Sequence, residues 1–195
     1  LSMKWLYGEY RKPLDQYDIV KLHILADFRH ILENGEPFIG GQPAAWPYGP
    51  VVRDSYFQAM QWASDGGQFK LQSQDKNVYR MIPCQPLTEQ ERQEIPEEAL
   101  QALEQSWEFH APMSFAESDA YFHQGPDFGT VWQRARQTGV GTLIDWCEIV
   151  DAYDAHRGED HSHIKTLLNA SSNDELMEIA QKRMAPRGYW TGEID

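Results

Sequence analysis

The most constraining feature of the chain is a glycine- and proline-rich stretch that separates two apolar segments near the N-terminus. Before it, apolar residues recur at helical spacing and predict an amphipathic helix over residues 17–34: Val20, Ile24, Phe28, Ile31 and Leu32. Asn34-Gly35 is a typical helix stop. Glycines and prolines between residues 37 and 47 then exclude a helix. We expect the next helix to open at Pro50, which suits a first turn, and to end at Asp65-Gly66-Gly67.

Further along, two short extended runs at residues 69–72 and 78–82, joined by a polar turn, predict a β-hairpin. Thr88 with Glu91, and Ser114 with Glu117, have the spacing of capping boxes, so each predicts a helix start. Between them Pro96 begins another helix, whose inner side we expect to carry these residues: Leu100, Leu103 and Trp107. The helix that Ser114 opens should end near residue 123.

The last third of the chain predicts short helices separated by a polar stretch. Residues 127–136 predict a turn or two of helix, and Thr142 is a candidate N-cap for a helix over 143–153. Residues 156–163 are polar and predict a linker or exposed loop, followed by a final helix over 172–184.

Together these elements predict a predominantly helical α+β fold. We expect a compact multi-helix domain with a small antiparallel β-hairpin over residues 1–154, and a C-terminal helical extension over 155–195.

Charge narrows the classes of partner. The chain has 17 Lys and Arg against 30 Asp and Glu, a net charge of −13. This balance disfavours nucleic acid, which is bound mainly through Lys and Arg, and it permits attraction to a basic protein. Alternatively, the acidic surface only maintains solubility. The N-terminal residues lack the apolar region of a signal peptide, no segment is long enough to cross a membrane, and Cys84 and Cys147 are expected as reduced, partly buried thiols. We therefore expect a cytoplasmic protein.

Two motifs in the first third of the chain point to a family. Residues 21–30 read K-L-x-x-x-A-D-x-x-H, and residues 45–51 read A-W-x-Y-G-P-V, followed by Tyr56. This arrangement resembles the Panacea domain, the SocA-like family that also includes phage-associated GepA proteins. The resemblance continues in SFAESDAYFHQGPDFGTVW at residues 114–132 and IDWCEI at 144–149, so that it covers roughly residues 17–154.

The chain also departs from the family pattern. Phe122 stands where the family has Thr before the histidine, and residues 127–131 separate Pro126 from Trp132. Within the motifs, the resemblance implies structural roles for six residues: Asp27, His30, Gly49, Pro50, His123 and Trp132.

The resemblance implies an antitoxin of a bacterial or phage toxin–antitoxin system that neutralises its toxin by direct protein–protein binding. It implies no catalytic residue, no cofactor and no metal. The expected partner is a cognate protein toxin, with no nucleic acid and no membrane. In an alternative role, the protein is an adaptor that delivers the toxin to a protease for degradation, with residues after 155 taking part.

Candidate partner-binding residues lie in and after the second motif: Trp46, Tyr48, Arg53 and Tyr56. Trp, Tyr and Arg are the side chains that most often dominate binding energies at protein interfaces. The alternative for Trp46 and Tyr48 is that they only pack the loop onto the helices.

A different class of function rests on the spacing of the first helix. His23, Asp27 and His30 share one helical face and, with His123, suggest a metal-dependent hydrolase. The stronger interpretation is that Asp27 and His30 form hydrogen bonds to the Tyr-Gly-Pro loop or to a helix end. The histidines of 156–163 are likewise better explained by a solvated linker than by a metal site.

Overall fold

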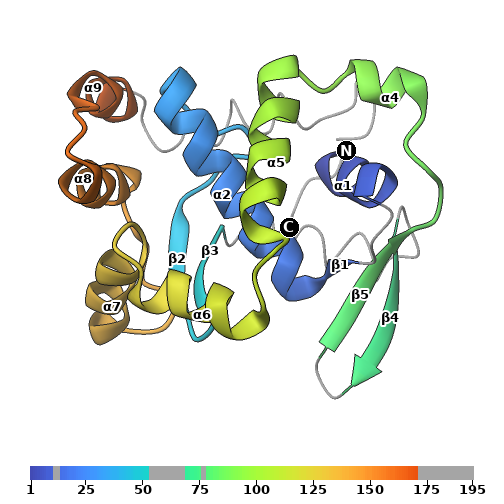
Figure 1. Cartoon of the computed structure of the whole chain (residues 1–195), viewed down its shortest axis with the longest axis horizontal. Helices are drawn as coiled ribbons and strands as arrows, with labels where there is room; N and C mark the ends of the chain where they lie inside the picture. The colour runs from blue at the N-terminus through green and yellow to red at the C-terminus, as the bar shows by residue number, and fades with distance from the viewer. Residues whose placement is uncertain (11–13, 53–68, 76–77, 171–195) are drawn as a thin grey trace, which may run out of the picture.

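The protein has a predominantly helical α+β fold (Figure 1). The computed structural model describes residues 1–10, 14–52, 69–75 and 78–170. In chain order the elements are α1 (Ser2–Tyr10), β1 (Leu14–Asp15), α2 (Gln16–Asn34), β2 (Pro43–Trp46), β3 (Gly49–Val52), β4 (Phe69–Asp75), β5 (Val78–Pro83), α4 (Glu89–Gln93), α5 (Glu97–His110), α6 (Phe115–Gln124), α7 (Gly129–Thr138), α8 (Trp146–Arg157) and α9 (Ser162–Ala170). Within these ranges no helix is both long and apolar enough to cross a membrane.

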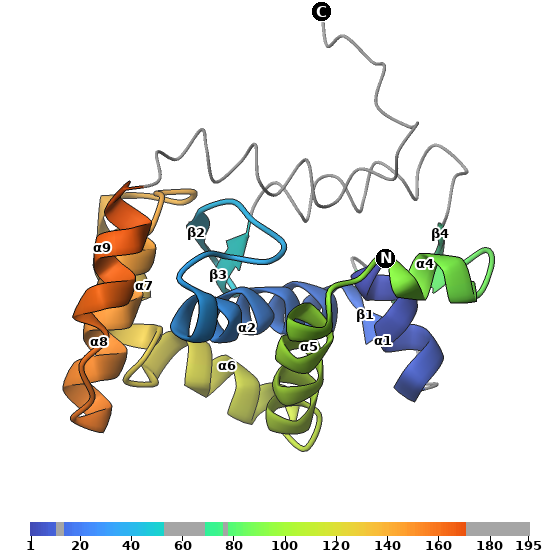
Figure 2. The same cartoon turned by 90° about the horizontal axis from the view of Figure 1, so that it is seen from above.

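Helix α2 is the helix predicted over residues 17–34. The Asp15 side chain caps its first turn by accepting a hydrogen bond from the Asp18 N–H. Gly35 ends the helix in the left-handed conformation, with φ of 79°, and its N–H donates to the Ile31 carbonyl. In both views α2 crosses the middle of the molecule (Figures 1 and 2).

The prediction that a helix opens at Pro50 is wrong, because Pro50 lies in strand β3. Strands β2 and β3 form an antiparallel hairpin, in which Ala45 pairs with Pro50 and Trp46 with Gly49. The fixed φ of proline suits an edge-strand position as well as a first helical turn, so local preference did not separate the two. The rest of that predicted helix, with its stop at residues 65–67, lies outside the described residues.

A further segment pairs with the free side of β2. The N–H of Ala45 donates to the Thr142 carbonyl, and the N–H of Ile144 donates to the Pro43 carbonyl. This pairing explains why Thr142 is not the N-cap of the next helix. Asp145 caps α8 instead, while the Thr142 hydroxyl donates to the Gly139 carbonyl.

The second predicted hairpin is confirmed as β4 and β5, which pair antiparallel. Strand β1 adds to the other side of β5, giving the order β1-β5-β4. Neither β1 nor helix α1 was expected. Both capping boxes are confirmed: Thr88 opens α4, and Ser114 opens α6. Pro96 directly precedes α5, as predicted, and the turn or two of helix expected over residues 127–136 is α7.

The polar stretch at residues 156–163, predicted as a linker or exposed loop, is a loop only at residues 158–161, between two helices. Helix α8 extends into its first two residues and ends at Arg157, where Gly158 has φ of 70°, and α9 starts at Ser162. The predicted division at residue 155 therefore falls inside α8. The final helix expected over 172–184 lies outside the described residues.

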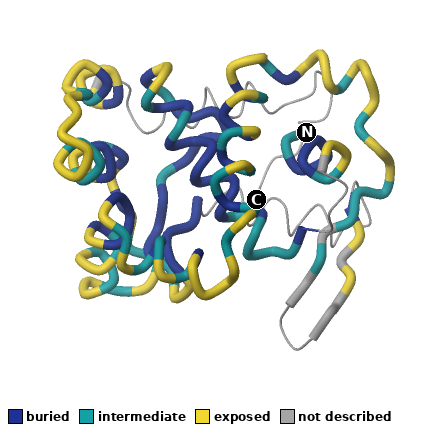
Figure 3. The backbone as a smooth tube through the Cα atoms, viewed as in Figure 1, coloured by how far each residue is buried: buried dark blue, intermediate teal, exposed yellow. Residues whose placement is uncertain are grey.

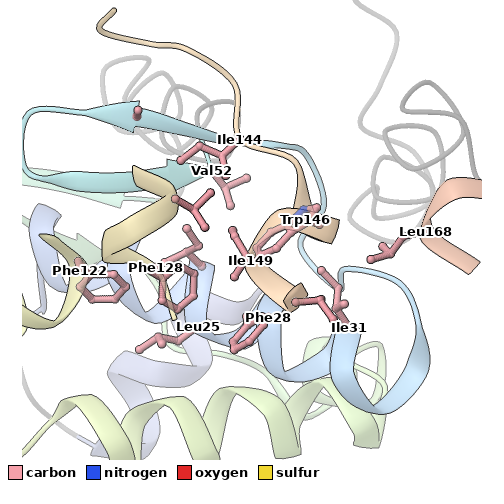
Figure 4. Packing of buried hydrophobic residues seen from close by; sticks show 14 of the residues in the cluster. Leu25, Phe28, Ile31, Val52, Phe122, Phe128, Ile144, Trp146, Ile149 and Leu168 are labelled. Carbon is pink, nitrogen blue, oxygen red and sulfur yellow. The ribbon is translucent and has the colours of Figure 1, made fainter. Parts of the chain in front are cut away.

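Helix α2 separates two apolar clusters. The first joins α2 to α1, β1 and α5 and includes Trp5, Leu22 and Leu103. The second joins the other side of α2 to the β2–β3 hairpin and to α6 through α9; Figure 4 shows its side chains, among them Phe28, Phe128 and Trp146. Burial is accordingly greatest along α2, as Figure 3 shows, and the outer helices carry most of the exposed residues. Cys84 and Cys147 are free and half-buried, as expected.

Candidate functional site: the junction of α2 with the hairpin

Lys21 is the residue around which the hairpin is assembled. Its side chain is fully buried, and its ammonium Nζ donates a 3.0 Å hydrogen bond to the Pro50 carbonyl. The same Nζ lies 4.5 Å from the ring centre of Phe122 and 5.2 Å from that of Tyr17. Burial lowers the pKa of Lys21 to about 7, partly opposed by the charge of Asp119. A buried lysine whose Nζ bonds a backbone carbonyl therefore fixes β3 against α2.

Gly49 leaves the space that Lys21 occupies. Its φ is 95°, a backbone conformation that residues other than glycine rarely adopt. A Cβ atom at this position would lie 2.7 Å from Lys21 Nζ and 3.0 Å from the Cβ of Phe122. Two features therefore require glycine at position 49. The turn needs a positive φ, and the side chains of Lys21 from α2 and Phe122 from α6 leave no room for a Cβ atom.

His123 and Trp132 complete the junction from α6 and α7. Their rings lie 4.2 Å apart, His123 Nδ1 pairs with Asp119 at 2.9 Å, and the Trp132 indole N–H donates to the Trp46 carbonyl at 2.9 Å. The residues 127–131 that interrupt the family pattern therefore do not separate these two rings. Residues of all these motif segments meet at the hairpin.

Asp27 and His30 hold the loop that leads into the hairpin. The Asp27 carboxylate, which is fully buried, accepts hydrogen bonds from the backbone N–H groups of Ile39 and Gly40. Burial raises the pKa of Asp27 to about 7, and these backbone donors oppose the rise. His30 Nδ1 lies 2.6 Å from the Glu36 carbonyl. Both residues thus contact the loop at residues 36–40, which precedes strand β2 and the Tyr-Gly-Pro turn.

The side chains suggested as metal ligands on the first helix do not point to a common site. His23 Nε2 lies 3.1 Å from the Ser2 hydroxyl, whereas Asp27 and His30 bond different parts of the loop. In the part of the chain that the structure describes, no group of three or more His, Cys, Asp or Glu side chains is placed to hold a metal ion. The contacts of these residues are those of structural side chains.

The residues suggested for partner binding differ in exposure. Tyr48, at the tip of the hairpin, has 66% of its surface exposed, whereas Trp46 is half-buried and its carbonyl is bonded to Trp132. Arg53 and Tyr56 lie outside the described residues. Among those described, Tyr48 is the member of the set that presents an aromatic ring to solvent.

Sequence reasoning missed the role of Lys21 and Asp119. A signal for Lys21 was present, since it is the first residue of the K-L-x-x-x-A-D-x-x-H motif. A lysine at a helical position is normally assigned to solvent, and only its distance to Pro50 and Phe122 reveals its burial.

Comparison with known proteins identified one family. The family model for the antitoxin SocA-like, Panacea domain matches residues 19–126. This range contains Lys21, Asp27, the hairpin and His123, and it ends before Trp132 and residues 144–149, which the sequence analysis had included. No curated protein and no solved structure matches the chain.

Proposed function

Since the chain belongs to the Panacea domain family of SocA-like antitoxins, we propose that it neutralises a cognate protein toxin in the cytoplasm by direct contact, without catalysis. The observation that carries the proposal is the family match over residues 19–126. The geometry adds support, because the matched motifs build a paired hairpin whose tip presents Tyr48 to solvent.

The proposed contact includes the hairpin tip. An exposed tyrosine on a hairpin held by Lys21 and Trp132 is ordered before binding, so little conformational entropy is lost on association. Arg53 and Tyr56, next along the chain, are proposed to extend the same contact. The net charge of −13 favours fast association with a basic toxin surface.

Coexpression tests the proposal. The product of the gene beside this one is expressed in a bacterial host, alone and with the protein. We expect arrest of growth by that product alone and recovery when both are present. A neighbour that is harmless alone, or one that remains lethal in the presence of the protein, contradicts the antitoxin function.

The mode of neutralisation is tested in the same cells. If the protein acts by covering the toxin, recovery persists in a host that lacks the ClpXP protease, and toxin levels stay unchanged. Recovery that depends on the protease, with toxin levels falling only in its presence, supports the adaptor role instead.

A further inference from the structure

A second surface of the molecule combines arginines with aromatic rings. We call it the arginine–aromatic surface and define it by five residues from four helices: Arg29, Phe109, Tyr121, Tyr153 and Arg157. The guanidinium carbon of Arg29 lies 5.7 Å from the ring centre of Phe109, and that of Arg157 lies 5.5 Å from the ring centre of Tyr153. Helix α6, which carries Tyr121, lies between α5 and α8 in Figure 2.

The rings between the two arginines form a continuous chain of contacts. Phe109 and Tyr121 are 5.1 Å apart, Tyr121 and Phe128 are 6.0 Å apart, and Phe28 contacts both Phe128 and Tyr153, at 5.2 and 5.3 Å. Phe28 and Phe128 are buried and visible in Figure 4. The surface thus rests directly on the second apolar cluster.

Both arginines act on the same tyrosine. Burial, and then the charge of Asp127, raise the pKa of the Tyr121 hydroxyl, while the charges of Arg29 and Arg157 oppose that rise. Tyr121 donates its hydroxyl hydrogen to Asp127 Oδ2 at 3.0 Å, and the buried Oδ1 of Asp127 has no hydrogen-bond partner among the described residues. Along the chain of ring contacts, Tyr121 thus lies between the ring under Arg29 and the ring under Arg157.

Neither arginine forms an ion pair with a carboxylate of the described residues. Elsewhere in the same ranges, Arg92 pairs with Glu9 and Arg134 with Glu148. Arginine presents several N–H donors in a plane suited to a carboxylate, and these donors stay available when the plane lies over an aromatic ring.

We propose that the arginine–aromatic surface docks an acidic region of the toxin, with carboxylates of the toxin bonding Arg29 and Arg157. This inference rests on the proposed function. Tyrosine and arginine over a packed base are the composition of interface residues that dominate binding energy. Net charge steers the encounter with the toxin as a whole, whereas these two arginines fix the orientation in which it binds.

The affinity of the purified protein for the product of the adjacent gene tests the surface. We expect Arg29→Gln or Arg157→Gln to weaken binding by about 10-fold each, and the double variant by about 100-fold or more. Arg92→Gln is the matched control: it makes the same change of net charge on α4, and we expect at most a 2-fold effect. Arg29→Lys with Arg157→Lys keeps the charge but loses the planar donor set, so binding should be intermediate.

The outcomes separate the two proposals. If the wild-type protein does not bind the neighbour's product, the antitoxin function fails and this surface with it. If the wild type binds and the double variant binds within about 3-fold, only the surface is wrong. If Arg92→Gln loses as much affinity as the variants of Arg29 and Arg157, the loss comes from the change in net charge, and the specific contact is wrong. Binding of the wild type to a single-stranded RNA oligonucleotide, lost in the double variant, would instead assign the surface to nucleic acid.

Discussion

Lys21 and Arg29 lie on the same helix, and each has its charge close to an aromatic ring, yet their surroundings differ. Lys21 is fully buried, bonds the Pro50 carbonyl and touches Phe122 from α6. Arg29 is half-exposed and covers Phe109 without a carboxylate partner in the described part of the chain. The difference teaches that a cation over a ring has no fixed role. Burial and a carbonyl partner make Lys21 a structural residue, whereas exposure leaves Arg29 available for binding.

The largest loss of stability is expected from a substitution of Asp27, a second buried ionisable residue of α2. Asp27→Ala leaves the N–H groups of Ile39 and Gly40 buried without an acceptor, which should lower the free energy of unfolding by about 3 kcal/mol or more. Urea denaturation measures this. The control is Asp151→Ala, which removes an exposed carboxylate paired with Lys165 and should change stability by about 0.5 kcal/mol or less. Equal losses in the two variants would contradict the role of Asp27.

The space beside Lys21 is tested by two glycines with similar backbone geometry. Gly49 and Gly141 have φ of 95° and 80°, but only at Gly49 would a Cβ meet other atoms. Both alanine variants carry backbone strain of about 1 kcal/mol, and Gly49→Ala should lose roughly 2 kcal/mol more through overpacking against Lys21 and Phe122. Thermal and urea denaturation compare the pair. A loss at Gly141 as large as that at Gly49 would show that the close approach is unimportant.

Lys21 also predicts a pH dependence of stability. Its folded pKa is about 7 and its ordinary value is 10.5. Between these values the unfolded chain binds the proton more strongly, so the free energy of unfolding rises with pH, by up to about 1.4 kcal/mol per pH unit. Stability measured from pH 7 to 9.5 should therefore rise in the wild type and stay flatter in Lys21→Met. Lys165→Met, at an ion-paired lysine whose pKa is raised, should keep the rise. If Lys21→Met follows the wild type, burial does not lower the pKa of Lys21 in the folded protein.

The smallest change in the free energy of unfolding is expected at Arg29, which is half-exposed. Arg29→Gln removes one contact with the Phe109 ring, worth about 0.5–1 kcal/mol, and its effect should not vary with pH because arginine stays charged. Chemical denaturation at pH 7 and 9 checks this. A loss of 2 kcal/mol or more would make Arg29 structural, like Lys21, and would remove the contrast between them.

How far the sequence predicts this fold depends on how local each signal is. Helix α2, the two capping boxes and the β4–β5 hairpin follow from patterns within a few neighbouring residues, and all are confirmed. The β2–β3 hairpin and the Asp145 cap were missed, because Pro50 suits a strand or a helix start and both Thr142 and Asp145 are good capping residues. Pairing of residues 142–144 with β2 decides between these alternatives, and that contact joins distant parts of the chain.

By itself, the sequence determined the family, the mostly helical class and the acidic character of this protein, because motifs, periodicity and charge are properties of the chain as written. Only the tertiary structure decided which charges are structural and which are available. Lys21 becomes buried because Gly49 and Phe122 close over it, and Arg29 and Arg157 come to flank Tyr121 because α2, α6 and α8 pack around one apolar cluster. Burial depends on what the rest of the chain places beside a residue, and no local pattern contains that information.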